Sequence, residues 1–174
     1  MEFRVKRFNE LTTDELYAIL KLRCEVFIVE QECPYPDIDG VDDQAVHVMF
    51  VDDGAGDGDA NGEPGDGKCG EPGDGDVNLA AYLRILPAGL EFEHVSIGRV
   101  IAVRRRQGLG TEIVKKGIEV ARNELGADTI YLEAQVYAMS MYEKLGFVPV
   151  SEEFLLDGIP HIKMELHAYV HYTR

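Results

Sequence analysis

Apolar and polar residues alternate along several short segments of the chain, which is the period of a half-buried β-strand. The first segment, 3–8, reads FRVKRF and sets apolar side chains against basic ones. Other segments are short apolar runs bounded by turn residues, which is also typical of strands. We therefore expect extended chain at 3–8, 45–51, 79–86, 94–103, 129–134, 146–150 and 161–167.

Helical spacing of apolar residues marks three further segments. Thr12 and Glu15 match a capping box and predict a helix over 13–28. A second amphipathic helix ends near Gly126, and a short one is expected at 138–145. The resulting order, β-α-β-β-β-α-β-α-β-β, predicts an α+β fold with an antiparallel front and a βαβ back half.

Residues 52–78 differ in composition from the rest of the chain. They hold nine of the 18 glycines and nine acids against one lysine, so they carry −8 of the formal charge of −15. The segment has almost no apolar side chain to bury and cannot offset the entropy lost on ordering. A calcium loop is the alternative, but neither the frame nor the flanks fit an EF-hand. We interpret 52–78 as a flexible acidic insertion at the tip of a hairpin, within one domain over 1–174.

Composition narrows the class of protein. The 174 residues suit one domain, and 45% apolar residues are enough for a core. The 32 acids against 17 bases give a pI of about 4.6, which argues against a nucleic-acid-binding protein. The chain has neither the run of about 20 apolar residues of a membrane helix nor the apolar segment of a secretory signal.

The cysteines point to a reducing cytoplasm. Cys24, Cys33 and Cys69 form no CxxC pair and are odd in number, so we expect neither a disulfide framework nor a structural zinc site. Cys24 lies in the apolar part of the first expected helix and is interpreted as a core residue. A covalent cysteine mechanism lacks a recognisable neighbouring base.

The acidity also suggests a source that lives in concentrated salt. Outside 52–78 the other 147 residues still carry −7, and the whole chain has only seven lysines. High ionic strength screens such charge and makes it tolerable. We therefore expect a halophilic protein, whose stability rises with salt concentration.

A glycine turn joins the expected strand 94–103 to the next helix. It reads RRRQGLGT over 104–111 and contains the only basic cluster of the chain. N–H groups at a helix start have no intrahelical partner and lie at the positive end of the dipole, where phosphate binds. We expect an anion there, with a solvated face as the alternative. The Walker A motif fails because Leu109 replaces its lysine, and the dinucleotide fingerprint fails because Ile113 replaces its third glycine.

The turn resembles the [RQ]xxGxG motif of the GNAT superfamily of N-acetyltransferases, with Arg105, Gly108 and Gly110 at the motif positions. Downstream, LEAQ at 132–135 and YEKLGF at 142–147 resemble the strand and the YxxxGF segment of the same family. Similarity to its ElaA-like branch extends over 20–42, 97–100 and 157–164. The resemblance covers nearly the whole chain except 52–78.

The resemblance implies a GNAT-like mixed sheet of about seven strands, flanked by helices and splayed between the fourth and fifth strands. Acetyl-CoA would lie in the gap as co-substrate, with its diphosphate on the helix start and its pantetheine arm on the edge of the fourth strand, and no metal would be needed. The turn after Val103 is two or three residues shorter than is usual in the family, which allows the strand assignment to shift by that amount. The implied cofactor-binding residues are Ile101, Ala102, Val103, Arg105, Arg106, Gln107, Gly108, Leu109, Gly110, Thr111 and Gln135.

The same resemblance implies that Tyr142 protonates the leaving thiolate, with packing of the short helix as the alternative. Glu133 is a candidate base, because strand alternation places it on the same face as Gln135. His161, in an ElaA-like segment, is a further candidate that faces the amine site. His47 lies on an alternating strand, where a base in the cleft and a structural histidine are both possible, and we favour the structural role.

The combined interpretation is an acetyl-CoA-dependent N-acetyltransferase that moves the acetyl group directly to a primary amine of a small molecule or peptide. One alternative is an acyl-homoserine-lactone synthase-like acyltransferase, which shares the fold but would need a basic docking face. Another is a non-catalytic sensor that binds acetyl-CoA. We expect no nucleic-acid or membrane partner, and a homodimer is the common default for the oligomeric state.

Overall fold

A computed structural model describes residues 2–32, 35–52, 77–104 and 107–168. The inserted segment 53–76 and the motif residues Arg105 and Arg106 therefore lie outside the described residues. The principal elements, in chain order, are β1 (Glu2–Arg7), α1 (Thr13–Arg23), β2 (Val46–Val51), β3 (Leu79–Leu86), β4 (Val95–Ala102), α2 (Leu109–Leu125), β5 (Thr129–Gln135), α3 (Met139–Lys144), β6 (Val148–Pro149), β7 (Phe154–Leu156) and β8 (Ile159–His167). Short helical turns are η1 (Phe8–Glu10), η2 (Cys24–Glu30, a π-helix), η3 (Asp42–Gln44) and η4 (Val136–Ala138).

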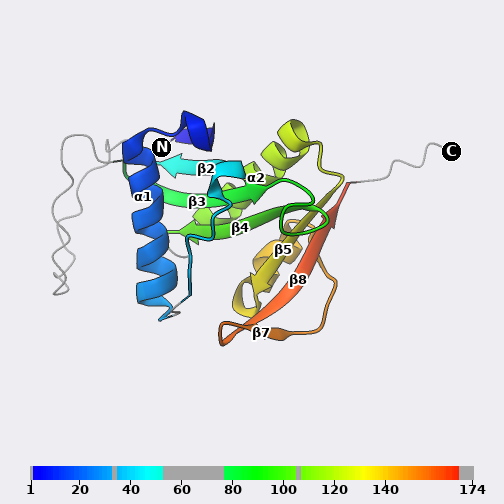
Figure 1. Cartoon of the computed structure of the whole chain (residues 1–174). Helices are drawn as coiled ribbons and strands as arrows, with labels where there is room; N and C mark the ends of the chain where they lie inside the picture. The colour runs from blue at the N-terminus through cyan, green and yellow to red at the C-terminus, as the bar shows by residue number, and fades with distance from the viewer. Residues whose placement is uncertain (1, 33–34, 53–76, 105–106, 169–174) are drawn as a thin grey trace.

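The strands form one mixed sheet in the order β1-β2-β3-β4-β5-β8-β6, with β7 paired to β8 (Figure 1). All neighbours are antiparallel except β4 and β5. The predicted α+β fold is confirmed, with eight strands in the described residues where about seven were expected. The unexpected strand is β7, which turns into β8 through Asp157 and Gly158, both at positive φ. Its three residues are too few for alternation to show in the sequence.

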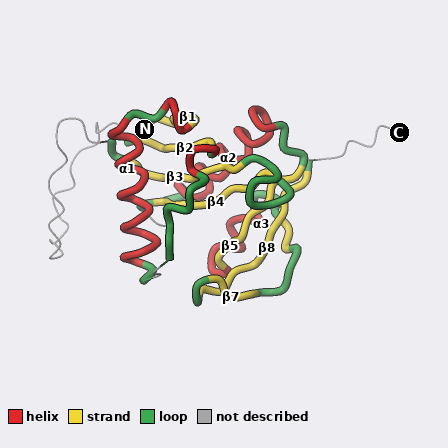
Figure 2. Tube along the Cα trace, in the orientation of Figure 1, coloured by secondary structure: helices red, strands yellow, loops and turns green. Residues whose placement is uncertain are grey.

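Helices cover both faces of the sheet (Figures 1 and 2). On one face Ile19 of α1 packs with Met49 of β2 and Tyr82 of β3. On the other, Ile113 of α2 belongs to a larger core that includes Val48 of β2. Because successive strand residues point to opposite faces, Val48 and Met49 pack into the cores on opposite sides of the sheet. Among the described residues, no helix is long and apolar enough to cross a membrane.

The first helix keeps its predicted start but changes form before its predicted end. Thr12 Oγ1 accepts from the N–H of Glu15 at 3.1 Å, and the Thr12 N–H donates to the Glu15 carboxylate at 2.9 Å, which is the predicted capping box. The helix is α to Arg23 and continues as a π-helix to Glu30. Its inward positions recur every four residues, at Glu15, Ile19, Arg23 and Phe27. Cys24 follows one of them by about 100°, so it is exposed, and the expectation that it belongs to the core is wrong.

β4 and β5 part soon after they meet. Their parallel pairing consists of Val95 with Ile130 and Ser96 with Tyr131. Beyond this point β4 stays with β3 as far as Ala102, whereas β5 pairs with β8 along its whole length. The predicted splay between the fourth and fifth strands is therefore present, and Figure 1 shows the two strands diverging.

Candidate active site

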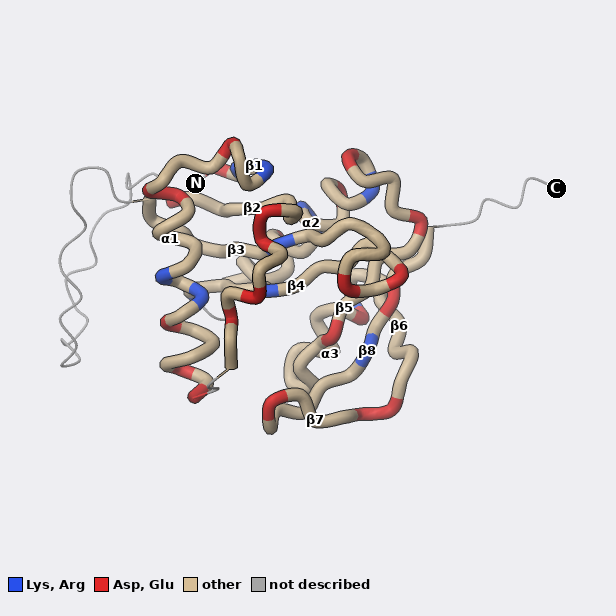
Figure 3. The backbone as a smooth tube through the Cα atoms, in the orientation of Figure 1, with Lys and Arg blue, Asp and Glu red and all other residues tan. Residues whose placement is uncertain are grey.

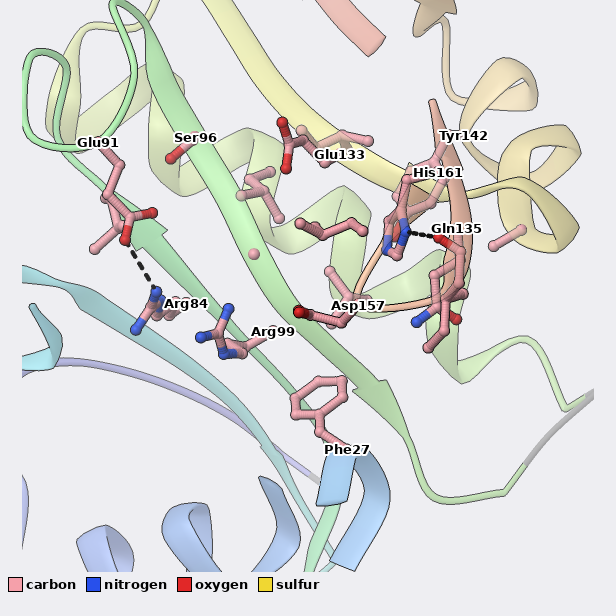
Figure 4. Close-up of a pocket in the computed structure, with 18 of the residues that line it drawn as sticks. Phe27, Arg84, Glu91, Ser96, Arg99, Glu133, Gln135, Tyr142, Asp157 and His161 are labelled. Carbon is pink, nitrogen blue, oxygen red and sulfur yellow. Dashed lines mark hydrogen bonds and ion pairs between the residues drawn. The ribbon is translucent and has the colours of Figure 1, made fainter. Parts of the chain in front are cut away.

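A cavity of about 240 Å³ lies between the diverging strands β4 and β5 (Figure 4). We call it the cleft. Its walls include Ser96–Val100 of β4, the second half of β5, the end of η2, the short helices η4 and α3, and the β7–β8 turn. In Figure 4, Glu133, Gln135, Tyr142 and His161 gather on one side, with Arg84 and Arg99 across from them. The cleft thus brings the three predicted catalytic residues and Gln135 together.

β4 bulges where it borders the cleft. Arg84 pairs with Gly98 and Tyr82 with Ile101, so Leu83 of β3 lies opposite two residues of β4. Arg99, one of those two, has a φ of 54°, a left-handed conformation that is uncommon outside glycine. A bulge bends the strand and redirects its groups. The bulge lies within Ser96–Val100, the part of β4 that lines the cleft, directly before the predicted pantetheine-binding residues 101–103.

The backbone N–H groups of the predicted pantetheine-binding residues 101–103 point to different edges of β4. The Val103 N–H donates to the Ala80 carbonyl at 2.9 Å, so it points to β3. Because successive N–H groups of a strand point to opposite edges, the Ala102 N–H points to the unpaired edge and that of Ile101 to β3. Binding of a pantetheine arm at these residues stays a prediction, and Ala102 offers the open donor.

The start of α2 presents unpaired backbone donors at the end of β4. Gly108 precedes the helix with a φ of 81°, and the first helical hydrogen bond runs from Glu112 N–H to the Gly108 carbonyl at 3.1 Å. The N–H groups of Leu109, Gly110 and Thr111 come before that bond and have no intrahelical partner. A Cβ added at Gly108 would meet no atom of the described residues within 4 Å. The site is open and fits a diphosphate, with Gln107 and Gly108 exposed beside it.

Gly110 has a packing reason of its own. A Cβ at this position would lie 3.2 Å from the Met141 sulfur of α3 and 3.9 Å from the Ala102 Cβ. The glycine therefore lets α2 approach α3 closely, one residue before Tyr142. The motif glycines do two different jobs: Gly108 supplies a left-handed turn and Gly110 a close contact.

Tyr142 is buried in the cleft wall, with its ring edge-on to Phe147 at 5.8 Å between centroids. Its hydroxyl makes no hydrogen bond to any described residue, although buried phenols usually find a partner. Burial, with a smaller contribution from Tyr137, raises the pKa of Tyr142 well above its usual value of 10.0. The side chain is therefore a protonated donor across the neutral range.

Glu133 and Gln135 both reach the cleft from β5, as strand alternation predicted. The Tyr131 hydroxyl donates to Glu133 Oε1 at 3.0 Å, and burial together with this carboxylate raises the pKa of Tyr131. Gln135 Nε2 donates to Gln31 Oε1 at 3.1 Å and so ties β5 to the end of η2. Glu133 is therefore the carboxylate that β5 presents to the cleft, and Gln135 is its neighbouring amide.

His161 lies opposite Gln135 in the β5–β8 register, and its Nδ1 is 2.8 Å from the Ile159 carbonyl oxygen. His47, by contrast, is buried outside the cleft, between the Tyr82 hydroxyl at 2.9 Å and the Asp42 carbonyl at 3.0 Å. Burial lowers the pKa of His47, so it is neutral. The structural role favoured for His47 agrees with this placement.

An ion network beside the cleft has no counterpart in the sequence predictions. It joins three arginines from α1, β3 and β4 to three aspartates of the segment before β2, whose acidic positions lie beside basic ones in Figure 3. Burial alone would raise the pKa values of Asp39 and Asp42. Hydrogen bonds from the arginines outweigh this effect, so both pKa values lie below their usual range. Two signals were available: the spacing DxDxxD at 37–42 and a lone arginine in the apolar strand LAAYLRIL. The network consists of Arg23, Arg84, Arg99, Asp37, Asp39 and Asp42.

Comparison with known proteins agrees with this geometry. The family model described as an acetyltransferase (GNAT) domain matches residues 78–168. A UPF0039 protein of Schizosaccharomyces pombe is 35% identical over 95% of this chain and 97% of its own length. The crystal structure of Escherichia coli ElaA is 35% identical, with a TM-score of 0.75 over 96% of this chain and all of that one. An acyl-CoA N-acyltransferase of Pseudomonas aeruginosa is also 35% identical, with a TM-score of 0.76 over 95% of this chain and 99% of that one. The chain therefore belongs to the GNAT acetyltransferase family, in the group that includes ElaA.

Proposed function

We propose that the protein transfers the acetyl group of acetyl-CoA directly to a primary amine in the cleft. The observation that carries this proposal is Tyr142: a buried phenol, kept protonated, whose hydroxyl is unpaired among the described residues and which lines the cleft between β4 and β5. A free proton donor at the splay of the sheet is what a thiolate leaving group requires.

Acetyl-CoA fits the two open backbone surfaces that border the gap. The unpaired N–H groups of Leu109, Gly110 and Thr111 suit its diphosphate. The unpaired edge of β4 suits the amide-bearing arm, and a backbone N–H of the bulge would stabilise the oxyanion that forms from the thioester carbonyl. Arg105 and Arg106 would add positive charge near the diphosphate, and they remain a proposal from the sequence.

Carboxylates outnumber arginines in the lining of the cleft. The lining holds Glu91, Glu133 and Asp157 against Arg84 and Arg99, and each of these arginines also pairs with aspartates outside the lining. An ammonium group is attracted there, and a carboxylate substrate is not. We therefore assign the acceptor to cationic primary amines, small or at a peptide N-terminus, without a carboxylate next to the amine.

The chemistry is a single displacement. The ammonium loses a proton to His161, while Glu133 holds the cation near it. The amine nitrogen then bonds to the carbonyl carbon, the carbon–sulfur bond breaks, and the thiolate takes the Tyr142 proton. The extra proton of the acylated nitrogen returns to the Tyr142 phenolate, and His161 releases its proton to solvent. No acyl-enzyme forms, and the products are an amide and CoA.

The test is thiol release from acetyl-CoA with a panel of polyamines, aminoglycosides, peptides with a free N-terminus and amino acids, with the acetylated product confirmed by mass spectrometry. The proposal expects turnover with cationic amines and little with amino acids. Binding of acetyl-CoA without turnover on any amine would favour a sensor. Acyl transfer only to an amino-acid-like acceptor would favour the lactone-synthase alternative.

A further inference from the structure

The bulge in β4 holds Arg99 in a conformation that costs energy. Its φ of 54° lies in the left-handed region, which is strained for a residue other than glycine. Such a residue persists only where its surroundings hold it in place. The pairing with β3 resumes on either side, at Gly98 and Ile101, so Arg99 has no partner residue in β3.

The side chain of Arg99 is held by a segment far away in sequence. Its Nε donates to Asp37 Oδ1 at 2.7 Å, and its Nη2 lies 3.1 Å from Asp39 Oδ2 and 3.3 Å from the Asp37 carbonyl. The guanidinium also lies over the Tyr35 ring at 5.5 Å. Each of these contacts belongs to residues 35–39, so this one segment anchors the bulge.

The anchoring segment is itself fixed on its other side. Arg23, fully buried in α1, donates through Nε to Asp37 Oδ2 at 2.8 Å and through Nη2 to the Asp37 carbonyl at 2.6 Å. Arg84 of β3 binds Asp39, and both buried arginines bind Asp42 at 2.7 and 2.8 Å. Asp37 therefore carries Arg23 on one oxygen and Arg99 on the other.

The two halves of the network differ in what they can do. Arg23, Arg84 and Asp42 are buried and hold the segment against α1 and β3, which is a structural role. Arg99 is different, because its side chain is 20% exposed and it belongs to the strand edge that borders the cleft. Its contacts determine where the bulge backbone lies with respect to the cleft.

We propose that Arg99 is a positioning residue: its clamp on Asp37 and Asp39 holds the β4 bulge so that a backbone N–H is directed at the thioester carbonyl in the cleft. This inference rests on the proposed function. The side chain touches neither the acyl group nor the acceptor in this role. It acts through the backbone, because a preorganised donor is worth more than one that must move into place.

The decisive variant is Arg99→Gly, since glycine adopts positive φ without strain and so removes the clamp while allowing the bulge. Arg99→Lys keeps the charge but lacks the planar fork that reaches both aspartates. The matched control is Lys6→Met, which removes a partly exposed cation from the buried Glu15, 2.7 Å away and outside the cleft. The control reports what loss of an ion pair costs in stability alone.

The readout is the carbonyl stretching band of bound acetyl-CoA labelled with ¹³C, with acetyl-CoA affinity measured by calorimetry. In the wild type we expect the band below its position in free acetyl-CoA, because the N–H polarises the carbonyl. In Arg99→Gly we expect affinity within about threefold of wild type, a band near the free position and turnover lowered at least tenfold, which is about 1.4 kcal/mol. Arg99→Lys should fall between the two, and Lys6→Met should match the wild type.

Two outcomes separate the inference from the proposed function. If acetyl-CoA does not bind the wild type, both are overturned. If it binds with a shifted band and the band stays shifted in Arg99→Gly, or in Arg99→Lys should the glycine variant fail to fold, the positioning role is overturned and the proposed function stands.

Discussion

His161 Nδ1 lies 2.8 Å from the carbonyl oxygen of Ile159, at the point where β8 passes the cleft. A carbonyl oxygen can only accept, so Nδ1 carries the proton in this contact. With its single proton on Nδ1, the ring presents the lone pair of Nε2. The hydrogen bond to Ile159 therefore fixes the tautomer that a general base needs.

Replacing His161 with glutamine should lower turnover more than the same change at Glu133, because only the imidazole takes the proton of the bound ammonium. We expect a loss of roughly 10²-fold or more near neutral pH. The loss should shrink as pH rises, since solvent then supplies the free amine. The measurement is kcat against pH for both variants, with His94→Gln, outside the cleft lining, as control. A constant loss across pH would assign His161 to packing.

Tyr142→Phe should lower turnover by roughly 10²–10⁴ and leave acetyl-CoA affinity near that of the wild type. Because the hydroxyl bonds to no described residue, its removal should also leave the melting temperature unchanged. The raised pKa of Tyr142 keeps the donor protonated, so the wild type should show no alkaline loss of activity from this group below pH 10. Tyr17→Phe, on a side chain 71% exposed, is the matched control. Equal turnover in both variants would leave Tyr142 as a packing residue.

Gly108 separates the effect of charge from that of backbone strain. Its φ of 81° penalises any side chain by about 1–2 kcal/mol, though Asn and Asp tolerate this region best. Gly108→Asp and Gly108→Asn therefore share the strain and differ in charge. We expect the aspartate variant to bind CoA at least tenfold more weakly than the asparagine variant, by calorimetry at low salt, because it places a carboxylate beside the diphosphate. Equal affinities would rule out a diphosphate on this helix start.

Local signals in the sequence predicted the elements that present these groups. Thr12 and Glu15 marked the start of α1, and Gly126 the end of α2, because capping depends on residues within one turn. Strand alternation likewise put Glu133 and Gln135 on one face. The splay of the sheet and the acid role of Tyr142 came from the resemblance to a family, not from periodicity.

The ion network was not predicted from the sequence, because no local pattern of residues encodes it. Arg23 meets Asp37 and Asp42 across 14 and 19 positions, and Arg99 meets Asp37 across 62. Which of the chain's acids lies beside which arginine is decided by how α1 and the segment 35–42 pack on the sheet. The bulge at Arg99 is likewise a property of two strands together, so no local pattern in β4 indicates it.

The insertion can be replaced by a short turn, because its two ends already meet. The Asp52 N–H donates to the Asn78 carbonyl at 2.9 Å, directly after β2 and before β3. Exchanging 53–77 for Asn-Gly, a tight hairpin turn, should keep acetyltransferase activity. The shorter loop should also raise the free energy of unfolding by roughly 2 kcal/mol, measured by urea denaturation. Loss of activity in a folded variant would show that the segment contributes to the site.

The same variant sharpens the prediction of salt dependence. The chain carries a formal charge of −15, and replacing 53–77 removes eight acids and one lysine, which leaves −8. Salt shortens the screening length from about 10 Å at 0.1 M to about 3 Å at 1 M, so self-repulsion weakens. The wild type should melt at a higher temperature in 1 M KCl than in dilute buffer, and the shortened variant should gain less. Equal melting temperatures of the wild type in the two buffers would contradict a halophilic adaptation, whereas an equal gain in both proteins would locate the repulsion in the folded domain rather than in the insertion.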